Sequence, residues 1–132
     1  MAIRVFQVQV TDAMADEVNA AGCWSAVAWG STYLNLTSGF DRPGRGVSTL
    51  VKSAIELGLV KLTRVIDTDS LDEAFAIGNG YGDESKQTVL EPSKSISVGD
   101  IMVGDVRAWA VASFGFDKLD ADVIDMLNEM AV

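Results

Sequence analysis

The sequence predicts an α+β fold: one compact domain over residues 1–132, with a mixed sheet, a C-terminal β-hairpin and three to four helices. The strongest pattern is a strand–turn–strand motif in residues 95–116, where β-favouring apolar residues flank Gly104-Asp105. Elsewhere, strand-like runs alternate with segments of helical periodicity, and no linker or repeat separates them. Because a hairpin makes at least one antiparallel pair, α+β is favoured over a doubly wound α/β fold. The apolar positions of the hairpin are Val98, Ile101 and Val103 before the turn, and Val106, Trp109, Val111 and Phe114 after it.

The first third of the chain predicts a strand and then a helix. Residues 3–10 alternate imperfectly between apolar and polar side chains, which is typical of a half-buried strand. Thr11 or Asp12 can cap the helix that follows, and Gly22 can end it in the left-handed conformation. Residues 23–36 fit either a strand pair or an irregular helix followed by a strand.

Aromatic residues are concentrated in that ambiguous stretch. Tyr33, with the leucines beside it, favours a strand in its second half. Trp24 and Trp29 are interpreted as core residues with one satisfied polar edge, although they also fit a ligand pocket. Cys23, the only cysteine, is expected to be a small buried residue.

The remaining elements follow in a clear order. Residues 38–46 form a glycine-rich loop, and residues 47–58 form an amphipathic helix. Residues 59–66 predict a strand, and residues 67–79 predict a helix capped by Asp69 or Ser70. Residues 81–94 are interpreted as an exposed connection to the hairpin, and residues 117–130 as a final acidic helix.

Composition excludes several kinds of chemistry. The chain has no histidine and one cysteine, so Ser-His-Asp or Cys-His catalysis and zinc or iron–sulfur sites within one chain are excluded. No paired acid/base site can be argued from the sequence, so no catalytic residue and no cofactor are predicted. The net charge of −9 argues against direct binding to nucleic acid or to an anionic membrane. No apolar run is long enough to span a bilayer and no secretion signal is visible, so the expected location is the cytoplasm.

Negative charge is concentrated in residues 67–85 and 117–132, which include two predicted helices. Helix capping explains the acids of residues 67–73 better than a metal site does, because the spacing of a calcium loop is missing. A solvated surface is the simplest interpretation. The alternative is a surface that binds a basic protein or imitates the phosphates of DNA. The residues predicted for that partner-binding surface are Asp69, Asp72, Glu73, Asp120, Asp122 and Asp125.

A second hypothesis places a small-ligand or nucleotide site in residues 40–49. Glycines and arginines there precede a helix, and free helical N–H groups beside positive charge favour an anion. The residues predicted for this site are Arg42, Arg45 and Ser48. The spacing matches neither a P-loop nor a dinucleotide-binding fingerprint, so a solvated surface loop is the simpler interpretation.

The residues Ser95-Ile96-Ser97-Val98-Gly99-Asp100-Ile101 are followed by Val111-Ala112-Ser113-Phe114-Gly115-Phe116. This pair of segments resembles the YodL-like domain found in small proteins of phages, plasmids and other mobile elements. Residues 10–19 and 67–79 are similar to segments of phage proteins, those of cyanophages included, whereas residues 23–48 match no family. The resemblance implies an origin and carries no site residue.

The leading hypothesis is therefore a non-enzymatic phage or mobile-element accessory protein that binds a host or viral protein in the host cytoplasm. Inhibition of a DNA-binding host protein through the acidic surface is a special case. Self-association into a homo-oligomer is a further alternative.

Overall fold

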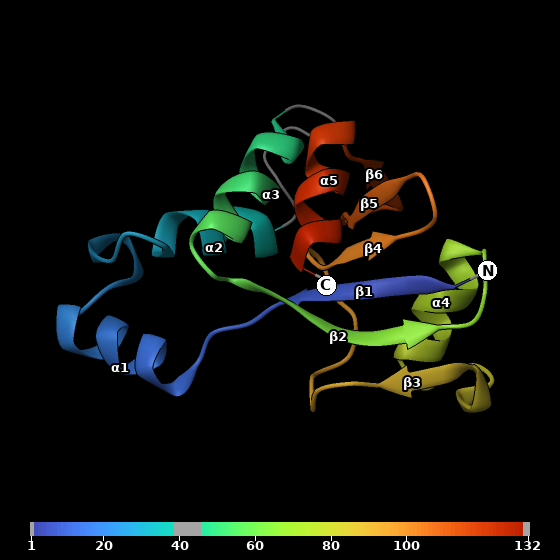
Figure 1. The fold of residues 1–132 in the computed structure, drawn as a ribbon. Coiled ribbons are helices and arrows are strands. Elements are labelled where there is room, and N and C mark those ends of the chain that lie inside the picture. The colour runs from blue at the N-terminus through green and yellow to red at the C-terminus, as the bar shows by residue number, and fades with distance from the viewer. Residues whose placement is uncertain (1, 39–45, 131–132) are drawn as a thin grey trace.

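A computed structural model describes residues 2–38 and 46–130, and it has the predicted α+β class (Figure 1). The described strands form one sheet in the order β3-β2-β1-β4-β5-β6. The strands are β1 (Ile3–Val8), β2 (Val60–Ile66), β3 (Gln87–Val89), β4 (Ile101–Val103), β5 (Ala108–Val111) and β6 (Phe116–Lys118). The helices are α1 (Asp12–Ala21), α2 (Gly30–Thr37), α3 (Val47–Glu56), α4 (Leu71–Gly78) and α5 (Ala121–Met130), with 3-10 turns η1 (Trp24–Ala26) and η2 (Glu84–Lys86).

The first strand of the chain lies in the middle of the sheet. β1 pairs with β2 on one side and with β4 on the other, and it is buried almost throughout instead of half-buried. Val8 at the end of β1 is paired with Val60 at the start of β2, so the long helical connection returns the chain antiparallel to β1. All pairings between described strands are antiparallel, where a mixed sheet was expected.

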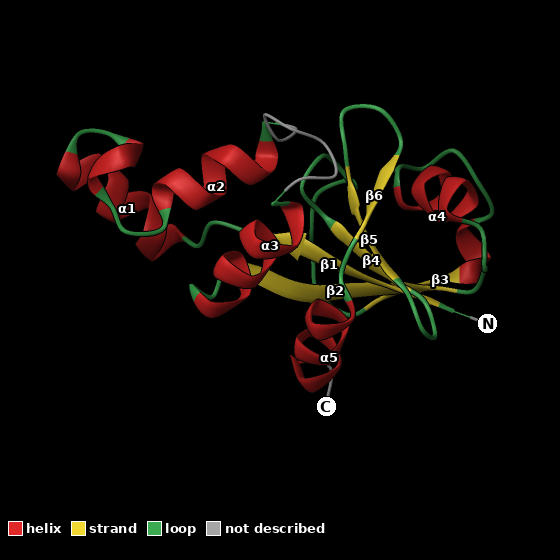
Figure 2. Cartoon of the chain, turned by 90° about the horizontal axis from the view of Figure 1, so that it is seen from above, coloured by secondary structure: helices red, strands yellow, loops and turns green. Residues whose placement is uncertain are grey.

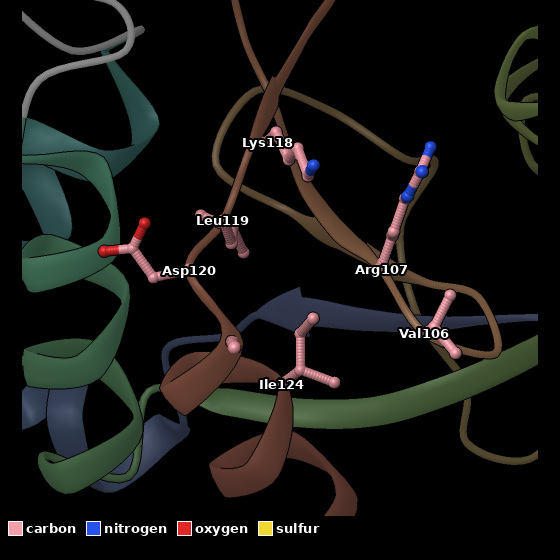
Figure 3. A pocket seen from close by; sticks show the side chains of 7 residues that line it. Val106, Arg107, Lys118, Leu119, Asp120 and Ile124 are labelled. Atoms are coloured by element: carbon pink, nitrogen blue, oxygen red, sulfur yellow. The ribbon is translucent and has the colours of Figure 1, made fainter.

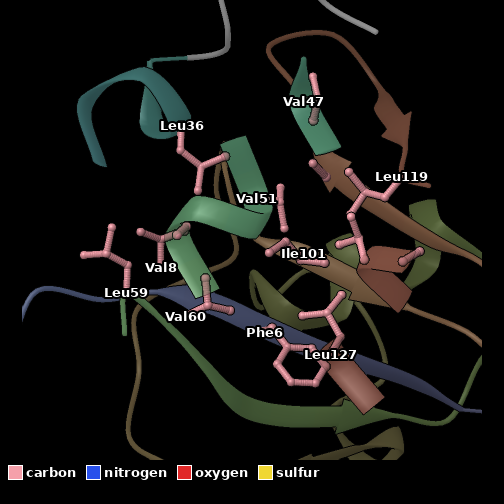
Figure 4. Close-up of a cluster of buried hydrophobic side chains, with 14 of the residues drawn as sticks. Phe6, Val8, Leu36, Val47, Val51, Leu59, Val60, Ile101, Leu119 and Leu127 are labelled. Atoms are coloured by element: carbon pink, nitrogen blue, oxygen red, sulfur yellow. The ribbon is translucent and has the colours of Figure 1, made fainter. Parts of the chain in front are cut away.

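Alternation of side chains along the strands gives the sheet two buried faces. On one face, Phe6 and Ile101 pack with α3 and α5 in a large apolar cluster (Figure 4). On the other face, Val5 and Met102 pack with Ala74 of α4 in a smaller cluster. α4 and α5 therefore cover opposite faces of the sheet, as Figure 2 also shows.

Residues 90–100, called the strap below, cross the α4 face from the edge strand β3 to β4. Their Ile96 belongs to the apolar cluster of that face. A Cβ atom at Gly78 in α4 would lie 2.2 Å from Cδ1 of Ile96, so the absence of a side chain there lets the strap approach. Gly99 has φ of +93°, and a Cβ there would lie 2.8 Å from the carbonyl oxygen of Leu36 in α2.

A buried polar network fastens the strap to the sheet. The Asp100 carboxylate, which is fully buried, accepts hydrogen bonds from the Val8 N–H (3.0 Å), the Ser97 N–H (2.9 Å) and Gln7 Nε2 (3.0 Å). Two of these three donors are backbone N–H groups. The Gln7 side chain also donates to the carbonyl oxygen of Lys94 and accepts from Thr63 Oγ1.

Arg64 on β2 extends this network toward α4. Its guanidinium donates to the carbonyl oxygen of Gly78 (3.0 Å), to Oγ of Ser93 (2.6 Å) and to the carbonyl oxygen of Lys94 (2.8 Å). Burial lowers the pKa of Arg64, and the charge of Asp100 opposes that shift. One side chain thus joins β2, α4 and the strap.

The main departure from the predicted elements is α2, which occupies the stretch where a strand was expected. Trp29, Tyr33 and Leu36 are spaced for one helical face, and this spacing outweighs their preference for strands. Tyr33 stacks on Trp24 with ring centroids 5.0 Å apart, and Trp29 is buried, so the aromatic residues pack together in the core. Cys23 is exposed, contrary to its predicted burial, because it precedes the η1 turn at the surface.

The hairpin is shorter than predicted, and two edge strands were not foreseen. β4 and β5 cover only residues 101–103 and 108–111, and Val106 and Phe114 lie outside them. β3 lies within the predicted exposed connection. β6 occupies the start of the predicted final helix, which begins instead at Ala121. Each edge strand has three residues, too short for a clear alternation pattern.

Replacing Asp100 with alanine is expected to lower the free energy of unfolding by about 3 kcal/mol, because hydrogen-bond donors of Val8, Ser97 and Gln7 lose their acceptor. Urea denaturation measures the difference. Asp105→Ala in the exposed β4–β5 turn is the control, with an expected change below about 0.5 kcal/mol. Equal losses in the two variants would contradict the structural role of Asp100.

Candidate functional site

The side of β5 and β6 that faces α4 is only partly covered. Trp109 and Val111 of β5 pair with Lys118 and Phe116 of β6, so these four side chains share one face. The Phe116 ring lies 6.3 Å from the Phe75 ring of α4, which shows that this face is turned toward α4. The β5–β6 surface is defined here as Val106, Arg107, Trp109, Phe114, Phe116 and Lys118.

Two pockets open between this surface and the N-terminal part of α4. The first is lined by Ile3, Asp69, Arg107 and Trp109, together with the β4–β5 turn. The second is lined by Asp72, Phe75, Val111, Phe116 and residues of the β5–β6 loop. Each pocket combines apolar side chains with a carboxylate, which is the character of a site that binds an extended or amphipathic group.

A third pocket, of about 460 Å³, lies at the end of the hairpin nearest α5 (Figure 3). Arg107, beside the β4–β5 turn, and Lys118, on β6, line this pocket, and Ile124 points toward it from α5. The carboxylate of Asp120 is directed toward α3. Val106 and Arg107 line both this pocket and the first one, so the β4–β5 turn separates the two.

Arg107 and Lys118 differ from the other cations of the described chain because their side chains make no ion pair or hydrogen bond with a described residue. The other described lysines and arginines are all engaged: Arg4, Lys52, Lys61, Arg64, Lys86 and Lys94. In a chain with net charge −9, Arg107 beside the β4–β5 turn and Lys118 on β6 are therefore a local site of positive charge that no described residue neutralises.

Large apolar side chains are exposed at both ends of β5. Val106, in the turn before it, is 77% exposed, and Phe114, in the loop after it, is 95% exposed. Both were predicted as strand residues of the hairpin. Their exposure follows from the tight turns, in which Gly104 N–H donates to the Arg107 carbonyl and Ala112 N–H donates to the Gly115 carbonyl.

The six acids predicted for partner binding do not form one surface. Asp69, Asp72 and Glu73 lie at the start of α4, whereas Asp120, Asp122 and Asp125 lie at α5, on the opposite face of the sheet. Of these six, only Asp69 and Asp72 line the two pockets beside α4.

Two of the acids have a cation partner in the described chain. Glu73 lies 3.3 Å from Lys86, and hydrogen bonds from Thr68 and Lys86 lower its pKa. Asp122 is paired with Lys52, whose hydrogen bond lowers the pKa of that carboxyl. Asp125 is exposed on α5.

The predicted ligand loop is only partly described. Arg42 and Arg45 lie outside the described residues. The Ser48 hydroxyl accepts the backbone N–H of Asp120 at 2.9 Å, so it joins the starts of α3 and α5. The structure thus brings together Ser48 of the predicted ligand site and Asp120 of the predicted partner surface. Their hydrogen bond has a structural role.

Arg107 and Lys118 were missed by the sequence analysis. Arg107 was given no role, and Lys118 was placed in the predicted final helix. The alternation of Phe116, Asp117 and Lys118 after Gly115 is the only sequence signal for β6.

Within residues 2–38 and 46–130, no three acidic, cysteine or histidine side chains are grouped to hold a metal ion. None of the helices in these same ranges is long and apolar enough to cross a membrane. Comparison of the chain with protein-family models, curated proteins and solved structures found no match.

Replacing Asp122 with asparagine is expected to lower the melting temperature at pH 7, because Lys52 loses its partner. The pKa of this carboxyl is lowered in the folded chain, so its contribution is present above the ordinary value of about 3.9 and is lost as the pH falls through the lowered pKa. The difference from the unmodified protein should therefore shrink between pH 5 and pH 3. Thermal unfolding followed by circular dichroism measures it.

The matched control is Asp125→Asn on the same helix, which removes an exposed carboxylate that has no described cation partner. A difference for Asp122→Asn that stays constant over this pH range would contradict the ion pair as its cause.

Proposed function

We propose that this chain is a non-enzymatic binding protein that contacts another protein through the β5–β6 surface. The observation that carries the proposal is the exposure of Val106 and Phe114 at the two ends of β5, beside pockets with charged rims. Exposed apolar and aromatic groups with polar surroundings are the usual anchors of protein interfaces.

The position of the polar groups supports a binding role. The buried polar side chains Gln7, Thr63, Arg64 and Asp100 are used to fasten the strap. The charged side chains around the pockets, such as Asp69 and Arg107, are exposed at their rims. An interface with an apolar centre and a polar rim has this arrangement.

The resemblance to the YodL-like domain supports an accessory protein of a phage or mobile element, with a host or viral protein as its partner in the host cytoplasm. One of its two segments falls on this surface, because residues 111–116 contribute Phe114 and Phe116. Asp69 and Asp72 favour a partner with basic groups near α4, and the net charge disfavours a nucleic acid in that place.

Replacing both Val106 and Phe114 with serine is expected to reduce capture of the partner about tenfold or more, because the exposed anchors are lost while the core is unchanged. Quantitative pull-down from lysate of host cells, with and without phage genes expressed, measures the captured proteins by mass spectrometry. Both positions are exposed, so the melting temperature should not change.

Tyr81→Ser is the matched control, since Tyr81 is 86% exposed but lies after α4, outside the β5–β6 surface. Capture that is equally strong with the double variant, or equally reduced by the control, would exclude this surface as the interface.

A further inference from the structure

β6 is an edge strand with backbone groups that no described residue uses. The Ala112 N–H donates to the Gly115 carbonyl and the Leu119 N–H donates to the Ala108 carbonyl. With the register Ala110↔Asp117, the backbone groups of Asp117 point inward to β5, and those of Phe116 and Lys118 point outward. The outward N–H and C=O groups have no hydrogen bond to a described residue.

The two edges of the sheet differ in their charges. Near β3, Lys86 pairs with Glu73 and Lys61 pairs with Glu91. At β6, Lys118 and the neighbouring Arg107 have no described partner. A negatively charged binding segment is therefore favoured at β6. At β3 it would find no described cation without a carboxylate partner.

We propose that β6 receives an extended acidic segment of the partner protein as a seventh, antiparallel strand. The inference rests on the proposed function, because it names the chemistry of the partner at the same surface. The added main chain exchanges hydrogen bonds with Phe116 and Lys118, which is the usual mode of strand addition at an open edge. An antiparallel direction continues the pairing found between all described strands of this sheet.

The register defines a short pattern in the partner. A residue opposite Lys118 shares its face, and an Asp or Glu there gives an opposite-charge cross-strand pair. The residue opposite Phe116 lies on the same face and extends the apolar contact between Phe116 and Phe75. Since the added strand runs antiparallel, the pattern reads acidic–x–apolar from the N-terminus to the C-terminus.

Residues before the acidic position continue past the end of β6. The pocket shown in Figure 3 lies there, with Arg107 and Lys118 above an apolar floor that includes Ile124. A second acidic residue at this point meets Arg107. The partner segment is thus expected to be acidic at its N-terminal end and apolar at its C-terminal end.

A second copy of this chain fits the edge less well. The two-fold register that pairs every outward group of β6 sets Lys118 of each copy opposite Phe116 of the other. Both lysines then have no carboxylate opposite them, and two chains of net charge −9 are brought together. An acidic segment of another protein makes hydrogen bonds with the same backbone groups, and it also places a carboxylate opposite Lys118.

The test is a titration of the full chain, labelled with 15N, with the synthetic peptide TTETVT. Amide resonances of Phe116 and Lys118 should shift with increasing peptide and reach saturation at millimolar concentration or below. The peptide TTKTVT should bind about fivefold more weakly, because a like charge replaces the cross-strand pair. The peptide TTETPT should not bind, because proline removes the N–H opposite Phe116.

Charge-reversal variants provide a second test. Lys118→Glu should weaken TTETVT about fivefold and strengthen TTKTVT by a similar factor, whereas Lys61→Glu, at an exposed lysine of β2, should leave the preference for TTETVT unchanged. The peptide comparison in the unmodified protein decides the proposal even where a variant does not fold. Absence of binding, equal binding of all three peptides, or shifts confined to β3 would each overturn it.

Sedimentation equilibrium without peptide tests whether a second copy of this chain binds at the β6 edge. A dimer that Lys118→Glu alters and TTETVT dissociates would assign the edge to self-association and overturn the acidic segment. Failure of this proposal can be told apart from failure of the proposed function. If the Val106 and Phe114 variant loses capture of the partner but no peptide binds, the β5–β6 surface remains the interface and only the strand addition is excluded.

Discussion

The carboxylate of Asp100 is the point on which the arrangement of the sheet depends. It bonds the backbone of β1 at Val8 and the backbone of the strap at Ser97, and therefore fixes where the chain enters β4. Since β4 leads directly into β5 and β6, the same contact determines how the β5–β6 surface is presented to α4. A buried carboxylate that accepts several hydrogen bonds from different segments helps to specify a single register of those segments. The hydrogen-bond network around Asp100 thus holds the candidate interface in position but is not a part of that interface.

Much of the fold could be predicted from local patterns. The helices that carry a cap or a terminating glycine were found, because Thr11 and Ser70 accept the backbone N–H groups expected of them and Gly22 takes the left-handed conformation. α2 was missed because its residues favour strands individually, and only their contacts with Trp24 and α3 select the helix. β3 and β6 have three residues each and depend on a neighbouring strand for their existence.

The candidate site was less predictable, since it is made by residues distant in the sequence. Asp69 and Asp72 were recognised as acids of a helix start, yet their neighbours Trp109 and Phe116 became apparent only from the sheet order. The sequence gives charges but not their partners. For that reason Asp122, which is paired, and Lys118, which is unpaired among described residues, could not be distinguished beforehand.

The central position of β1 has a consequence for how the protein is made. The ribosome synthesises β1 before the other described strands of the sheet, but its two neighbours in the sheet begin only at residues 60 and 101. Until β4 leaves the exit tunnel, one side of a strand that is almost fully buried in the folded protein has no backbone partner. The backbone groups on the β4 side of β1 therefore stay unpaired during synthesis until residues 101–103 are available, and an unpaired strand edge of this kind favours aggregation.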